Sequence, residues 1–152
     1  EAAAGAEARV RDGDAEGEAE LGWLNSSLTI TSQEPFELDQ LVLDIVEQLR
    51  TDMADQSAET AHLKTIAMAD NQQAVANLVS SDSPAQLSLA SYASAKEVNL
   101  IVNARVAINP AVLQEYVIAA VTLCCKQRGA TADFNETQSF RPGRPVPTHR
   151  IL

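Results

Sequence analysis

The chain has 152 residues, the size of one ordinary domain, and its 21 acidic residues outnumber 11 basic ones to give a formal net charge of −10. That balance argues against a general nucleic-acid binder, which needs basic surface to displace counterions from phosphates. No apolar run approaches the roughly 20 residues that span a bilayer, so we expect neither a nucleic acid nor a membrane as partner.

The first twenty residues have the composition of a linker. They contain seven acids, two bases and one large aliphatic residue, Val10, among alanines and glycines. Such a segment cannot bury enough apolar surface to offset the entropy lost on ordering. We therefore expect residues 1–20 to be a disordered acidic linker and order to begin at Leu21.

Strand periodicity is followed by helix periodicity in residues 21–53. Apolar and polar residues alternate from Leu21 to Thr31, which predicts a strand, and Pro35-Phe36 is expected to end it. From Glu37 to about Met53 apolar residues recur three and four positions apart, the spacing of one helix face. The predicted buried stripe consists of Leu38, Leu41, Val42, Ile45, Val46, Leu49 and Met53.

The remainder of the ordered region indicates five further strands and a second helix. A hairpin is expected over residues 59–80, with its turn at Asp70-Asn71, and a short strand over 86–90. Residues 98–107 alternate most clearly, with five apolar side chains on one side. Asn109-Pro110 is typical of a helix start and Gly129 of a helix end, and a last strand is expected over 131–140.

This order of elements predicts one α+β domain over residues 21–140. Two amphipathic helices need one face of a sheet to cover them, so we expect a two-layer sandwich. The expected sheet is mostly antiparallel, with both helices on one face, and is ferredoxin-like with an extra strand. Residues 141–152, rich in proline and arginine, are expected to be an extended C-terminal tail.

No sequence motif points to a known catalytic centre. The phosphate-cradling and nucleophile-elbow patterns are absent from the sequence. Cys124 and Cys125 are adjacent, so their side chains would point about 100° apart on a helix and chelate poorly. We interpret them as reduced structural cysteines, which favours a cytoplasmic location. No cofactor, metal or catalytic residue is assigned.

One polar stripe is expected on the sheet face opposite the helices. Asn103 and Arg105 share one side of a strand whose other side is apolar, and His62 and Lys64 share one side of another strand. The stripe is either a solvated open face or a surface that docks another domain, a second copy or an anion. Apolar residues on the same sides favour docking; these are Ile66, Met68 and Ile101.

The tail carries a second group of candidate binding residues. Arg144, His149 and Arg150 lie among its prolines, which stiffen the backbone and reduce the entropy lost on binding. We expect Phe140 to anchor the start of the tail in the core. Its arginines, Arg141 included, would pair either with carboxylates of this chain or with an external anion.

Several short motifs together resemble the C-terminal region of some bacterial CobW-like proteins, the cobalamin-synthesis and metal-chaperone GTPases. The motifs are Gly22-Trp23-Leu24, Pro35-Phe36, Ala61-His62-Leu63-Lys64, Val102-Asn103-Ala104-Arg105-Val106 and the tail over residues 140–150. The resemblance covers roughly residues 21–151. The family's phosphate-binding loop, magnesium-binding acid and Cys-x-Cys-Cys motif are absent, so no catalytic or metal residue is carried over.

The resemblance implies a non-catalytic accessory or interaction domain. Its partner would be a protein, or a GTPase domain upstream in the same polypeptide, and a homodimer is a further possibility. The alternative is a small anion-binding protein or an enzyme that uses His62, Lys64, Arg105 and His149 in one cleft. Convergence of these side chains around an open pocket would favour the alternative.

Overall fold

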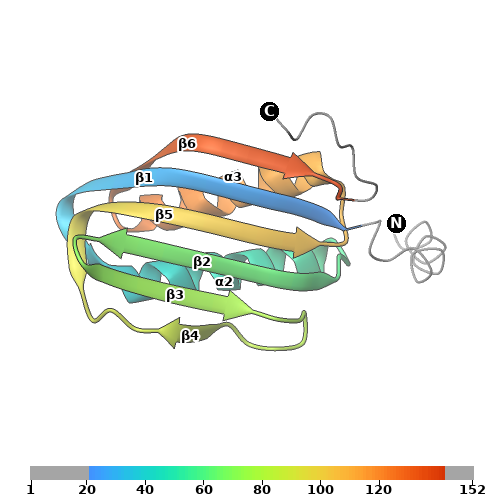
Figure 1. Ribbon diagram of the computed structural model, residues 1–152, viewed down its shortest axis with the longest axis horizontal. Helices are drawn as coiled ribbons and strands as arrows, with labels where there is room; N and C mark the ends of the chain where they lie inside the picture. The colour runs from blue at the N-terminus through green and yellow to red at the C-terminus, as the bar shows by residue number, and fades with distance from the viewer. Residues whose placement is uncertain (1–20, 143–152) are drawn as a thin grey trace.

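The computed structural model describes residues 21–142, which form one antiparallel sheet with two helices packed behind it (Figure 1). The strands lie side by side in the order β4-β3-β2-β5-β1-β6, and every neighbouring pair is antiparallel. The predicted α+β sandwich is therefore confirmed. The elements are β1 Gly22–Glu37, α2 Leu38–Asp55, β2 Thr60–Ala69, β3 Gln72–Leu78, β4 Gln86–Leu89, β5 Ser94–Val106, α3 Pro110–Gln127 and β6 Ala130–Phe140.

Two interlocked crossovers build the centre of the sheet. Helix α2 connects β1 to β2, and β5 lies between these two strands. Helix α3 connects β5 to β6, and β1 lies between them. The hairpin strands β3 and β4 extend the sheet beyond β2. The more specific ferredoxin-like description stays a prediction.

The core lies between the helices and the sheet face that they cover. All seven residues of the predicted stripe on α2 are buried. On β5, alternate residues from Val98 to Val106 are also buried, as the alternation in sequence predicted. The side chains between them face the other side of the sheet, because successive residues of a strand point to opposite faces. That side, which we call the open face, has no helix over it (Figure 1).

Helix α3 begins and ends at the predicted signals. The Asn109 side chain accepts a hydrogen bond from the backbone N–H of Ala111 at 2.8 Å, and Pro110 is the first helical residue. After Gln127 the chain turns through Gly129, whose φ of 70° suits a residue without a Cβ atom. Both terminal predictions for this helix are confirmed.

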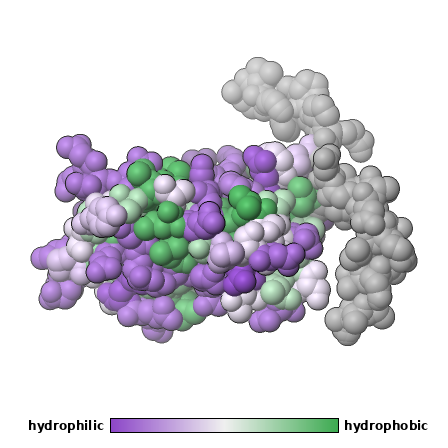
Figure 2. Space-filling view, turned by 90° about the horizontal axis from the view of Figure 1, so that it is seen from below, coloured by the Kyte–Doolittle hydropathy of each residue, from purple (hydrophilic) through white to green (hydrophobic). Residues whose placement is uncertain are grey.

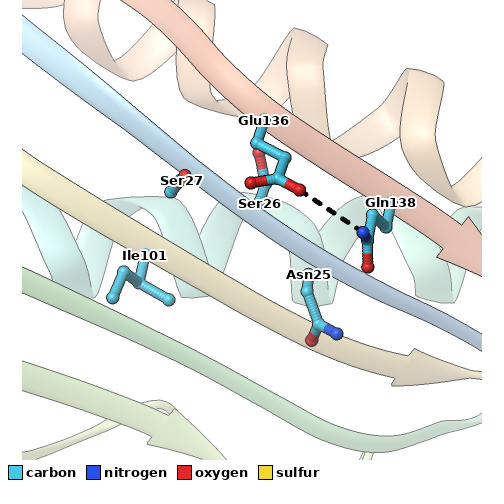
Figure 3. Close-up of a pocket in the computed structure, with 6 residues that line it drawn as sticks. All are labelled: Asn25, Ser26, Ser27, Ile101, Glu136 and Gln138. Atoms are coloured by element: carbon cyan, nitrogen blue, oxygen red, sulfur yellow. Dashed lines mark hydrogen bonds between the residues drawn. The ribbon is translucent and has the colours of Figure 1, made fainter. Parts of the chain in front are cut away.

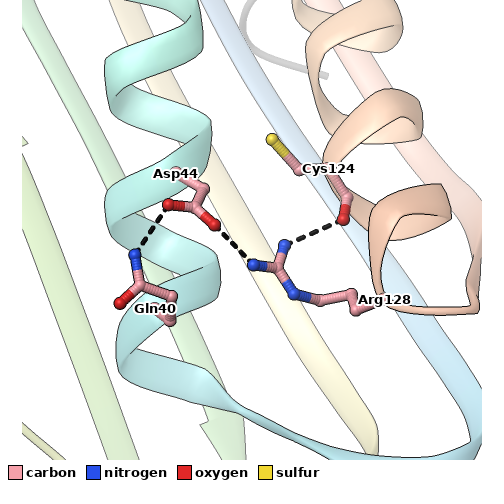
Figure 4. A network of polar contacts seen from close by, with 4 residues as sticks. All are labelled: Gln40, Asp44, Cys124 and Arg128. Atoms are coloured by element: carbon pink, nitrogen blue, oxygen red, sulfur yellow. Dashed lines mark hydrogen bonds and ion pairs between the residues drawn. The ribbon is translucent and has the colours of Figure 1, made fainter.

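Polar contacts tie the two helices together (Figure 4). Arg128, directly after α3, pairs with the Asp44 carboxylate of α2 and donates to the Cys124 carbonyl at 2.8 Å. Gln40 donates to the other oxygen of Asp44 at 2.7 Å. The Arg128–Asp44 pair thus links the end of α3 to α2.

The connection from β4 to β5 is held by the start of α2. The Asp39 carboxylate accepts hydrogen bonds from the backbone N–H of Ser91 at 2.8 Å and of Tyr92 at 3.0 Å, and one from the Ser91 hydroxyl at 2.8 Å. Burial alone would raise the pKa of Asp39, but these hydrogen bonds outweigh it and lower the pKa. The link between the edge strand and the central strand is thereby fixed.

The predicted end of the first strand is wrong. Strand β1 continues past Pro35 to Glu37, with a shift in its pairing to β5 between Thr31 and Phe36. Proline has no N–H to donate and is tolerated at such irregular points of a sheet. Phe36 resumes pairing beyond the shift, opposite Ala95, and is buried. The β5 strand correspondingly begins at Ser94, four residues before the predicted start at Val98.

Several predictions concern residues outside the described range. These are the linker over residues 1–20 and most of the tail, including the candidates Arg144, His149 and Arg150. In residues 21–142, neither helix combines the length and the apolarity needed to cross a bilayer.

Candidate functional site

One end of the open face carries a row of aromatic and cationic side chains. Arg105 of β5 is paired with His62 of β2 on one side and with Trp23 of β1 on the other. Trp23 is in turn paired with Phe140 of β6. Paired residues of antiparallel strands point to the same face, so four strands bring these side chains together.

Stacking organises this row. The guanidinium carbon of Arg105 lies 4.1 Å from the centre of the Trp23 ring, within the range of a cation–π contact. Phe140, on the neighbouring strand β6, contacts Trp23 from the side away from Arg105. The two ring centres are 5.9 Å apart and the ring planes are tilted by 49°. Phe140 is 38% exposed, so the expectation that it anchors in the core is wrong. Its pairing with Trp23 places its side chain on the open face.

The next row across the sheet consists of Lys64 and four amide side chains. Lys64 is paired with Asn103 of β5 and with Asn77 of β3. Asn103 is paired with Asn25 of β1, and Asn25 with Gln138 of β6. This row offers N–H donors from every strand between β3 and β6.

Residues of these two rows line an open hollow of about 370 Å³, which we call the cationic hollow. The sequence predicted His62, Lys64, Asn103 and Arg105 as one group, and the structure brings all four together here. Within residues 21–142 no carboxylate lines the hollow. Its lining consists of Trp23, Asn25, His62, Lys64, Asn103, Ala104, Arg105 and Phe140.

The charge of the hollow acts on His62. Burial lowers the pKa of His62 below its ordinary 6.5, and the positive charges of Arg105 and Lys64 lower it further. A side-chain hydrogen bond with Asn77 opposes this shift in part. His62 is therefore a neutral imidazole at neutral pH, and Lys64 and Arg105 supply the charge.

A second, smaller hollow adjoins the first on the open face (Figure 3). It has a volume of about 210 Å³ and lies over β1, where Ser26 and Ser27 have small side chains. Glu136 and Gln138 of β6 point toward each other at its rim, and the Gln138 amide donates to the Glu136 carboxylate at 3.4 Å. Asn25 lines both hollows.

A row of aliphatic side chains crosses the middle of the open face. Ile101 of β5 is paired with Ile66 of β2, Ile66 with Val75 of β3, and Val75 with Leu89 of β4. We call these four residues the aliphatic row. Leu89 is 48% exposed and the other three are half-buried. The view onto the β4 edge shows hydrophobic groups gathered between hydrophilic ones (Figure 2).

Sequence reasoning missed the aromatic part of the site. Trp23 and Asn25 alternate along β1 and so share a face, which was the available signal. The sequence gives no sign, however, that β1 lies between β5 and β6, because that depends on strand order. Asn77 could have been found from the predicted hairpin, because a turn at Asp70-Asn71 places it opposite Lys64.

The cysteines do not contribute to a site. Cys124 and Cys125 are buried on α3, and burial raises the pKa of each thiol to about 11. Both are thus protonated and unreactive, as predicted for structural cysteines. Within residues 21–142 no three metal-ligating side chains of His, Cys, Asp or Glu lie close together.

Comparison with known proteins identifies no relative. The chain matches no family model, and neither a curated protein nor a solved structure is significantly similar to it.

Proposed function

We propose that this domain is a non-catalytic interaction module that holds another protein domain against its open face. The observation that carries the proposal is the aliphatic row in the middle of that face. An antiparallel sheet with one solvated face normally has polar side chains there. Four adjacent strands instead contribute one aliphatic residue each to a row of paired residues, with a register shift beside the pair of Val75 and Leu89. Contiguous exposed apolar residues with a polar rim are typical of protein interaction sites.

The composition around the aliphatic row supports a protein partner. Trp23, Phe140 and Arg105 lie two rows from Ile101 on the same face. Tryptophan and arginine are enriched among the residues that contribute most to binding energy, and aromatic residues are enriched in interfaces generally. The amide row between them provides hydrogen-bonding groups for the rim.

We further propose that the partner is the nucleotide-hydrolysing domain of a CobW-like GTPase, within the same polypeptide or in a separate one. Four of the five motifs of the resemblance contribute residues to the cationic hollow. Trp23, His62 with Lys64, Asn103 with Arg105, and Phe140 come from segments far apart in the chain. Their convergence gives these segments a common binding surface. Because convergence of His62, Lys64 and Arg105 is also the sign expected of anion binding, the proposed docking of a protein domain depends on the aliphatic row.

Calorimetry with a defined partner tests this proposal. The full chain is titrated with the nucleotide-hydrolysing domain of a CobW-like protein from the same organism. We expect binding, and we expect Ile101→Glu to weaken it about tenfold or more, because a carboxylate would be buried in an apolar contact. Leu123→Glu is the matched control, since Leu123 is a 42% exposed aliphatic residue on the helix layer.

Three outcomes would count against the proposal. Absence of binding to this partner, or equal losses in Ile101→Glu and Leu123→Glu, would contradict docking on the open face. Sedimentation velocity gives the third outcome. A wild-type dimer that Ile101→Glu converts to a monomer would show that a second copy, and not a GTPase domain, covers the open face.

A further inference from the structure

We infer that the cationic hollow binds the phosphate group of a phosphorylated small molecule, whose organic part lies against Trp23 and Phe140. This inference goes beyond docking of a protein partner and does not depend on it.

The charge of the hollow is not neutralised by the described part of the protein. Lys64 and Arg105 lie on adjacent strands, and neither is in an ion pair within residues 21–142. The chain as a whole carries a net charge of −10. The hollow differs from this acidic average, because it is lined by two cationic side chains and by no carboxylate of residues 21–142. A phosphate monoester carries close to two negative charges at neutral pH, which match these two cations.

The donors are arranged for an oxyanion with several oxygens. The guanidinium carbon of Arg105 lies 4.1 Å from the centre of the Trp23 ring. Within residues 21–142 the guanidinium is in no ion pair, so its N–H groups are available for bidentate contacts. Lys64 adds three N–H donors, and the amides of Asn25 and Asn103 lie in the same row as Lys64. A carboxylate accepts about four hydrogen bonds on its two oxygens, whereas these four side chains together carry more N–H groups than that, which suits the three free oxygens of a phosphate monoester.

The size of the hollow indicates that more than the anion is bound. Its volume of about 370 Å³ falls within the range of small-molecule pockets, about 300–1,000 Å³. Trp23 and Phe140 both line the hollow and offer an apolar surface beside the cations. A phosphate ester with a planar apolar group would place its phosphate beside Lys64 and Arg105 and its planar group against Trp23 and Phe140.

Trp23 allows the inference to be tested directly, because it is the only tryptophan of the chain. A ligand that binds to Arg105 changes the environment of the indole ring of Trp23 and hence its fluorescence. The full chain is titrated with phenyl phosphate, inorganic phosphate and acetate at constant ionic strength, and the affinities are measured again by calorimetry. We expect phenyl phosphate to bind about tenfold more tightly than inorganic phosphate, and acetate not to compete.

Matched charge-removing variants locate the site. We expect Lys64→Gln and Arg105→Gln each to weaken phenyl phosphate binding about tenfold or more, since each removes a charge-assisted contact. Arg105→Lys retains the charge but loses the bidentate geometry, so it should bind with intermediate affinity. Lys96→Gln removes the same charge from an exposed position at the other end of β5 and should bind like the wild type. Unchanged melting temperatures would show that the variants fold.

Each contrary result has a defined meaning. Binding unaffected by Lys64→Gln and Arg105→Gln, or weakened equally by Lys96→Gln, would overturn the site. Acetate competing as well as phosphate would overturn the phosphate assignment. Equal affinities for phenyl phosphate and inorganic phosphate would overturn the part assigned to Trp23 and Phe140. All of these measurements use the chain alone, so their outcome neither supports nor contradicts the proposed protein partner.

Discussion

The two faces of the sheet are built from the same strands but follow different rules. On the covered face, β5 presents only buried apolar side chains, from Val98 to Val106. On the open face the same strand presents Ile101, Asn103 and Arg105 in succession. Contact with two helices constrains shape and polarity on one side, whereas the other side is free to carry an aliphatic row and a cationic hollow. The comparison separates residues that make the fold from residues that are available for binding.

Two neighbouring residues of β5 test this separation most strongly. We expect Leu100→Ala to lower the free energy of unfolding by about 2–5 kcal/mol, because it leaves a cavity in the core. Ile101→Ala, on the open face, should cost about 1 kcal/mol or less, because the side chain is only half-buried. Urea denaturation of both variants measures the difference. Equal losses would mean that the open face is packed as the covered face is.

Gly22 lies where the packing of β1 against a neighbouring segment leaves no space for a side chain. A Cβ atom at this position would lie 2.4 Å from the Ile108 carbonyl oxygen, in the segment that connects β5 to α3. Gly22→Ala should therefore destabilise the domain by about 1–3 kcal/mol through backbone displacement. Thermal denaturation checks this value. Ser27→Ala, on the open face of the same strand, is the control and should change the stability little.

Asn109 provides a smaller change at the edge of the helix layer. Its side chain satisfies a backbone N–H at the start of α3, so Asn109→Ala should lower stability by about 0.5–2 kcal/mol. Asn109→Asp keeps an accepting oxygen and should restore most of the loss. A stability unchanged in Asn109→Ala would show that the cap is dispensable, and helix formation would then depend on packing alone.

The smallest expected effect is the response of the open face to pH. The pKa of His62 is lower in the folded protein than its ordinary 6.5, so as pH falls the unfolded chain takes up this proton first. His62 thus opposes folding increasingly as pH falls from about 6.5 toward the folded-state pKa, and has no such effect above that window. The loss of stability between pH 7.5 and 5 should be smaller in His62→Gln than in the wild type. An identical loss in both proteins would contradict the shift.

Periodicity along the chain determined the elements and the covered face. The stripe of α2, the alternation of β5 and the Asn109-Pro110 helix start were all correct, because each depends on residues a few positions apart. The grouping of His62 and Lys64 with Asn103 and Arg105 was also predictable, since alternation alone assigns each pair to one side of its strand. These features follow from local backbone geometry and the burial of apolar surface.

Only the tertiary structure decided what surrounds that group. Trp23 stacks on Arg105 because β1 lies next to β5, and Phe140 joins them because β6 lies next to β1. Strand order of this kind is set by how α2 and α3 cross the sheet, and no local pattern records it. Two predictions were wrong for the same reason: that Phe140 lies in the core and that the first strand ends at Pro35-Phe36. In the structure, pairing with β5 resumes at Phe36 and extends β1 to Glu37. Pairing between distant segments decides such features, because it supplies the hydrogen bonds and neighbours that single residues lack.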